Sequence, residues 1–158
     1  MKKLLSMSVI LFCASVTVCA AANYDPTDVK KFKEINSCPS CNLSGASIYD
    51  NHQHANLTNA NLSNADLQGD YTLADFSGAN AVGVEISSAS GAKFVDATLI
   101  KGRLRGNFTD ADFSNANVSA ADFSNANLYH AKLTNQQLSS ARTICDAILP
   151  DGTTGKCN

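Results

Sequence analysis

The chain has 158 residues, with 12 lysines and arginines against 14 aspartates and glutamates, so its formal net charge is −2. Of its residues, 44% are hydrophobic but only 7% are aromatic, so much of the apolar fraction is alanine. This composition argues against a globule with a thick core, and against a nucleic-acid-binding protein, which would usually be basic. It suits a single-domain solenoid, in which each coil buries a narrow strip against the next.

The first 22 residues have the layout of a secretory signal peptide. Lys2 and Lys3 form a basic start, residues 4–18 form an apolar run, and residues 20–22 are small alanines. The run is short for a membrane span, which needs about 20 apolar residues. We predict cleavage after Ala22, export to the periplasm or the extracellular space, and no membrane attachment afterwards. Removal of both lysines takes the net charge from −2 to −4.

Residues 23–41 are expected to form an N-terminal cap, because a solenoid leaves an open edge at each end. Asp25 fits the N-cap of a short helix and Pro26 fits its first position. Val29, Phe32 and Ile35 are spaced as an apolar stripe. We expect this stripe to cover the first coil.

"CPSC" follows the helix, with Cys38 and Cys41 at its ends. A thioredoxin-like redox motif is one interpretation, but it needs a strand before the motif and a helix after it. A structural disulfide is the preferred one. The mature chain keeps an even number of cysteines, as is typical of disulfide-bonded exported proteins: Cys38, Cys41, Cys145 and Cys157.

A five-residue pattern runs through residues 42–149 and fits neither a helix nor a strand. We expect the large residue and the alanine of each repeat to point inward and the Asp or Asn to point outward. Ser, Thr, Asn and Gly would form the corners. Phe113 and Phe123 should therefore be buried, whereas Asp112 and Asp122 should face solvent. Large residues of this phase are Phe108, Phe113, Val118, Phe123, Leu128, Leu133, Leu138 and Ile148, with Thr143 interrupting the series.

Blocks such as "ADFSN", "ANVSA" and "ANLTN" resemble the A-(D/N)-(L/F)-X-X motif of the pentapeptide repeat family. "CPSCNLSGA" and "AILPDGT" are similar to the entry and exit of its exported members. The resemblance implies an all-β fold, a right-handed quadrilateral β-helix with four pentapeptides per coil, here about five coils and about 25 Å long. On that geometry Phe108 stacks under Leu128, Phe113 under Leu133, Val118 under Leu138, and Leu128 under Ile148.

The same geometry bears on the disulfide pairing. Cys38 and Cys41 precede the first coil, while Cys145 and Cys157 follow the last, so a rod about 25 Å long would separate the two pairs. A disulfide tolerates only about 4.4–6.8 Å between Cα atoms. The resemblance thus implies Cys38–Cys41 and Cys145–Cys157, with residues 150–158 as a tail that closes the second end.

The five-residue spacing slips at four places. Ile48 to Leu57 and Leu67 to Phe76 span nine residues each, Phe76 to Phe94 spans eighteen, and Leu104 to Phe108 spans four. The irregular segments are therefore "DNHQH", "GDYTL", "VGVEISSASG" and "RLRGN". Irregular surface on a rigid scaffold is one place for a binding feature. Neutral drift in corner length is the alternative that we favour.

Two clusters are candidates for a site. Lys101, Arg103 and Arg105 lie close together in "KGRLRG" and could meet an anionic partner, although a solvated surface patch is the more common reason for such a run. His52 and His54 would share a face of a strand and could bind a metal. With no third ligand evident, exposed polar residues in a slipped corner are the preferred interpretation.

The sequence favours a non-catalytic structural or protein-binding module. No histidine and acid flank a serine or cysteine as in a nucleophilic site, and no glycine-rich phosphate loop is present, so we expect neither enzymatic activity nor a cofactor. Some cytoplasmic members of the family mimic DNA and protect type II topoisomerases. That alternative needs a cytoplasmic location and a strongly acidic face, and the signal peptide and the small net charge argue against it. The partner is expected to be an unidentified protein rather than nucleic acid.

Overall fold

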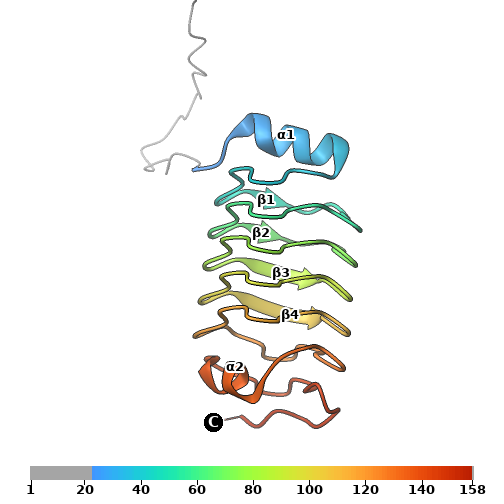
Figure 1. The fold of residues 1–158 in the computed structure, drawn as a ribbon, viewed down its shortest axis with the longest axis vertical. Helices are drawn as coiled ribbons and strands as arrows, with labels where there is room; N and C mark the ends of the chain where they lie inside the picture. The colour runs from blue at the N-terminus through green and yellow to red at the C-terminus, as the bar shows by residue number, and fades with distance from the viewer. Residues whose placement is uncertain (1–22, 158) are drawn as a thin grey trace, which may run out of the picture.

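The computed structural model describes residues 23–157, and the predicted signal peptide lies outside them. The described chain winds into a rod with a helix across its N-terminal end (Figure 1). Four short strands lie in one parallel sheet in the order β1-β2-β3-β4. In chain order the elements are α1 (Pro26–Ile35), β1 (Ser47–Ile48), β2 (Asp66–Leu67), β3 (Glu85–Ser88), β4 (Arg103–Asn107) and α2 (Asn135–Ser140).

The rod has four sides, each held by a ladder of parallel bridges between successive coils. We call the side that carries β1–β4 the strand side, and number the others in chain order before and after it. The first side joins Ser37, Asn56, Asp75, Lys93, Asp112 and Lys132. The second side joins Asn42, Asn61, Asn80, Thr98 and Asn117. The fourth side joins Ser88, Asn107, Asn127 and Ile148. This is the quadrilateral β-helix that the resemblance implies.

The residues around Leu57 show why a five-residue repeat makes a corner. The N–H of Ala60 donates to the carbonyl of Leu57 at 3.1 Å, and Asn59 between them has a φ of 57°. This is the geometry of a type II turn, which needs a residue that tolerates positive φ. The N–H and hydroxyl of Thr58 donate to the side chain of Asn56 at 3.2 and 2.9 Å. Asn or Asp before the large residue therefore caps the turn, a role that the sequence analysis gave only to the residues after the large one.

The interior is a filled column of large side chains and alanines. Phe113 and Phe123 are fully buried, as predicted. Phe113 stacks on Phe94 with ring centroids 4.8 Å apart, and Phe94 stacks on Phe76 at the same distance. Phe123 meets Phe113 edge to face at 6.0 Å. Aromatic pairs in these arrangements stabilise a core beyond the area that they bury.

The last coil departs from the predicted register because α2 is inserted into it. Asn107 pairs with Asn127 and Asp112 with Lys132, so Phe108 and Phe113 stack as predicted. Beyond α2, Asn127 pairs with Ile148, one residue later than expected. The expected stacking of Leu128 on Ile148 is therefore wrong. The ladder places Leu149 there instead, and Ile148 is 42% exposed.

Sequence reasoning missed α2, although its start carries a signal. Thr134 and Gln137 form a capping box, the Ser/Thr-x-x-Glu/Gln pattern of helix N-termini. The Gln137 amide also donates to the carbonyls of Phe113 and Ala116 at 2.8 and 2.9 Å. Leu138 lies in this helix, partly buried, so it does not continue the ladder under Val118 as expected.

The N-terminal cap is a helix, as predicted, with Asp25 as its N-cap and Pro26 at its start. Phe32 is fully buried on the first coil, but Ile35 is 60% exposed, so the predicted stripe is wrong at its last position. Asp28 occupies the covered face instead. Its carboxylate accepts the N–H of Asn42 at 2.8 Å and so fixes the helix to the first coil.

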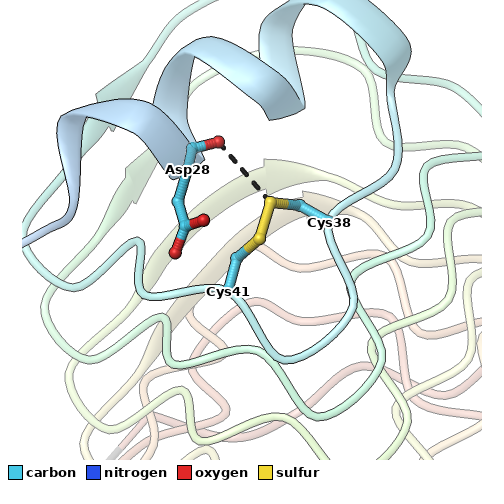
Figure 2. Close-up of side chains that lie close together, drawn as sticks. All are labelled: Asp28, Cys38 and Cys41. Carbon is cyan, nitrogen blue, oxygen red and sulfur yellow. Dashed lines mark hydrogen bonds between the residues drawn. A yellow bond between two sulfur atoms is a disulfide. The ribbon is translucent and has the colours of Figure 1, made fainter.

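Cys38 and Cys41 are joined by a disulfide under α1, next to Asp28 (Figure 2). Their residues are only 0% and 5% exposed, and the N–H of Cys38 donates to the carbonyl of Asn56 at 2.8 Å. The ladder thus begins at Ser37, a few residues before the expected start of the repeats, and "CPSC" forms part of the first coil. The motif has no strand–motif–helix setting, which the thioredoxin-like interpretation requires.

The C-terminal tail turns back along the last coil. Ile148 and Thr154 form an antiparallel bridge, and the N–H of Gly155 donates to the carbonyl of Ala147 at 2.7 Å. A disulfide joins Cys145 to Cys157, which is the pairing that the rod geometry implies. Backbone groups at this coil edge are thereby paired. No helix in the described part of the chain is long and apolar enough to cross a membrane.

Candidate functional site

The four slips in the repeat all fall at one corner of the rod, between the strand side and the fourth side. At this corner, the inward residue of the fourth side follows that of the strand side by four positions, or by three in the coil of β3. At a regular corner the spacing is five positions. The N–H of Tyr71 donates to Ser88, and that of Ala89 to Asn107, so the shortened coils remain hydrogen-bonded to one another. We call this column the shortened corner.

Two glycines explain why the shortened corners of successive coils lie on top of one another. A Cβ atom on Gly69 would lie 2.2 Å from the carbonyl oxygen of Asp50, and one on Gly106 would lie 2.1 Å from that of Ser87. Gly106 also has a φ of 118°, which residues with a side chain rarely adopt. Each coil therefore constrains the corner of the next. Independent drift, the interpretation favoured from the sequence, would instead scatter short corners over the four sides.

A shallow hollow of about 210 Å³ opens beside the shortened corner on the strand side. It lies where the register between β3 and β4 shifts, between Ile86 and Ser88. Most of its wall is polar or charged. The lining residues are Gln68, Glu85, Ile86, Ser87, Arg103 and Arg105.

The two arginines of the hollow have different partners. Arg103 lies 2.9 Å from the carboxylate of Glu85, which is itself partly exposed. Arg105 instead donates to Asp122 on the following coil. This hydrogen bond raises the pKa of Arg105, although desolvation acts against it. Arg105 is thus fixed by its partner, whereas Arg103 is held only by a surface ion pair, which is worth little in water.

The expectation that Asp122 faces solvent is wrong, because this residue is only 3% exposed. Arg105 covers it, and Arg142 approaches to 4.0 Å. Burial alone would raise the pKa of Asp122, but hydrogen bonds from Arg105 and Ser124 outweigh it and hold the pKa at about 2. Asp112 is less enclosed and pairs with the exposed Lys132 at 2.8 Å.

The structure brings together only part of the predicted basic patch. Arg103 and Arg105 alternate along β4 and both line the hollow. Lys101 is an exposed corner residue with a φ of 59° and does not line it. Glu85 and Asp122, which pair with these arginines, were not predicted as their partners from the sequence. A signal for them existed, since residues of opposite charge recur 17 to 19 positions apart, about one coil length.

His52 is not an exposed corner residue, which corrects the sequence interpretation. It is 5% exposed, points inward, and packs against Phe32 with the rings tilted by 33° and their centroids 4.3 Å apart. Its Nδ1 lies 2.7 Å from the side-chain oxygen of Asn36, the C-cap of α1. Burial lowers the pKa of His52. His54 is exposed at the next corner, with a φ of 57°, so the two do not share a strand face and do not form the metal pair that was considered.

A comparison with protein-family models finds pentapeptide repeats in this chain. The model matches eight copies, over residues 51–69 and 107–142. Both segments lie within the region where the ladder is observed. No curated protein matches the chain significantly.

Solved structures with a similar fold come from several organisms. A pentapeptide repeat protein (Rfr23) from the cyanobacterium Cyanothece 51142 is 25% identical, over 66% of this chain and 82% of its own, with a TM-score of 0.40. One from the Arabidopsis thaliana thylakoid lumen is 24% identical, over 70% and 78%, with a TM-score of 0.38. HetL, involved in heterocyst differentiation regulation in a Nostoc strain, is 22% identical, over 75% and 76%, with a TM-score of 0.33.

Proposed function

Because this chain is a pentapeptide repeat protein, we propose that it is a non-catalytic protein-binding module that is exported and binds its partner on the strand side. Pentapeptide repeat proteins are generally non-catalytic. The observation that carries the proposal is the hollow at the shortened corner. The hollow lies where the coils depart from their regular repetition, and it is lined mostly by polar and charged side chains on a rod whose interior is filled.

The size and lining of the hollow favour binding over catalysis. Its volume of about 210 Å³ is below the range of roughly 300–1,000 Å³ that is typical of pockets for small-molecule ligands. It holds no histidine, cysteine or second carboxylate beside Glu85 to serve as an acid–base pair. A hollow of this size and charge suits one side chain of a protein partner.

Export is supported by two features of the chain. The first 22 residues have the layout of a signal peptide, and two disulfides stabilise the two ends of the rod. Disulfides persist in oxidising compartments such as the periplasm and the extracellular space. N-terminal sequencing of the native protein should therefore begin at Asn23 or within a residue or two of it. A native chain that starts at Met1 in the cytosol would contradict this part of the proposal.

Affinity purification from the native envelope or secreted fraction tests the binding function. The full chain should capture the same partner reproducibly, and a double variant R103Q/R105Q should lose it. A matched control, Lys93→Gln, removes an exposed charge from the first side and should retain the partner. Equal capture by all three proteins would overturn the strand side as the binding surface. Capture of a type II topoisomerase from the cytosol would favour the DNA-mimic alternative instead.

A further inference from the structure

We infer that the hollow binds an acidic side chain of the partner protein, with the guanidinium group of Arg103 as the main contact. This inference rests on the proposed function and names the chemistry of its binding site. Two guanidinium groups and only one carboxylate, that of Glu85, line the hollow, because the carboxylate of Asp122 is buried under Arg105. The wall that an incoming group would meet therefore presents two guanidinium groups against one carboxylate, on a chain whose net charge is −2.

Arg103 has free hydrogen-bonding capacity. A guanidinium group has five N–H donors in a fixed fork that matches a carboxylate. Among the described residues, Glu85 is the one side chain that pairs with Arg103, with one guanidinium nitrogen 2.9 Å from its carboxylate, so the other N–H donors remain available. Its side chain is 54% exposed, so an incoming carboxylate reaches it without rearrangement of the backbone.

Glu85 acts as an internal competitor for this site. Its neighbour on the previous coil is Asp66, and like charges at adjacent ladder positions repel each other. The pairing with Arg103 offsets this repulsion in the free protein. When a partner carboxylate binds Arg103, the Glu85 side chain, already 35% exposed, turns to solvent. Removing the charge of Glu85 should therefore strengthen binding.

Arg105 is held in place at the hollow, next to Arg103 along β4. Its hydrogen bond to the buried Asp122 fixes the guanidinium group, and both arginines come from the same strand, β4. A site held by strands keeps its geometry better than one on mobile loops, so less freedom is lost when the partner binds. Arg105 is thus a positioning residue, and Arg103 is the binding residue.

Nuclear magnetic resonance titration with short peptides tests the inference. The probe is the blocked peptide acetyl-Ala-Glu-Ala-amide, whose only charge is the glutamate side chain, added to the full-length protein in its disulfide-bonded form. We expect shifts of the Arg103 side-chain and Ser87 backbone signals. R103Q should weaken binding at least about tenfold, and E85Q should strengthen it about threefold or more.

Three controls make the test decisive. Lys93→Gln on the first side should leave the affinity unchanged, and acetyl-Ala-Gln-Ala-amide should not bind. Acetyl-Ala-Ala-Ala with a free carboxyl end asks whether a chain terminus serves as well. Preference for that peptide would overturn the assignment to an acidic side chain. Equal affinity of wild type, R103Q and E85Q would overturn the site itself.

The outcome is distinguishable from failure of the proposed function. If R103Q binds the peptide weakly but the native chain captures no partner, the carboxylate site stands and the protein-binding function fails. If the single variant R103Q still captures the native partner fully, the binding function stands and this inference fails.

Discussion

The regular corners and the shortened corner both turn the chain from one side of the rod to the next, but they do so in different ways. At a regular corner, an Asn or Asp caps a type II turn within five residues, as around Leu57. At the shortened corner, successive coils lie so close together that a Cβ atom on Gly69 or Gly106 would meet a backbone oxygen of the previous coil at 2.2 or 2.1 Å. A regular corner therefore tolerates sequence changes in a single coil. At the shortened corner, neighbouring coils must shorten together, and the hollow lies beside this corner.

The largest loss of stability is expected from a substitution in the interior, which packs behind both kinds of corner. Phe113→Ala removes a ring that stacks on Phe94 and meets Phe123 edge to face. We expect a loss of about 3–5 kcal/mol in the free energy of unfolding. Urea denaturation followed by circular dichroism measures it. A loss below about 1 kcal/mol, the usual effect of a surface change, would mean that the inward register is misassigned.

Glycine substitutions separate the two kinds of corner. Gly106→Ala at the shortened corner should cost about 3 kcal/mol, because the added methyl group meets the Ser87 oxygen at 2.1 Å and the φ is 118°. Gly45→Ala at a regular corner should cost about 1 kcal/mol, since its φ is 71° but no atom lies within 4 Å of the added carbon. Thermal and urea unfolding compare the pair. Equal costs would remove the distinction between the corners.

The sequence predicted the regular region well and the shortened corner poorly. The turn that follows Leu57 is formed by residues of a single repeat, so the motif alone specifies it. The inward place of His52 and the burial of Asp122 depend on residues one coil away: His52 packs under Phe32 of the cap, and Asp122 is covered by Arg105. The one-residue register shift arises within the α2 insertion and is already present at Thr143, which pairs with Asp122. Predicting it required recognition of α2, which the capping box of that helix would have allowed.

Charge-removing substitutions compare an enclosed carboxylate with an exposed one. Asp122→Asn keeps an oxygen for the turn but loses the charged hydrogen bond with Arg105, so we expect about 2 kcal/mol of destabilisation. Asp112→Asn loses only the pair with Lys132, whose side chain is 71% exposed, and should cost about 0.5 kcal/mol. Denaturant titrations at pH 7 measure both. A larger loss for Asp112→Asn would contradict the burial that distinguishes them.

Acid should remove the Asp122 contribution over a defined range. The pKa of Asp122 is about 2 in the folded chain and 3.8 as an unperturbed side chain. A lowered carboxyl pKa stabilises the fold above pH 3.8, and this stabilisation is lost as the pH falls towards 2. The difference in stability between wild type and Asp122→Asn should therefore shrink across this range. A difference that stays constant down to pH 2 would contradict the pairing with Arg105.

The smallest effect is expected at the N-terminal cap. Burial lowers the pKa of His52 below its ordinary 6.5, with Asp50 opposing the shift and Lys33 adding to it. The unfolded chain then binds the proton more readily, so stability should fall as the pH drops below 6.5. His52→Gln should abolish this slope in denaturant titrations between pH 7 and 5. An unchanged slope would show that another group titrates there.

Site-specific photocrosslinking tests most directly whether the shortened corner is the binding surface. A photoreactive residue replaces exposed Gln68 at the hollow in one protein, and exposed Asn80 on the second side in another. Both proteins are expressed with the complete N-terminus in the native host and irradiated there. The account predicts a reproducible crosslinked partner from position 68 and none from position 80. A partner that crosslinks only from position 80, or equally from both, would contradict it.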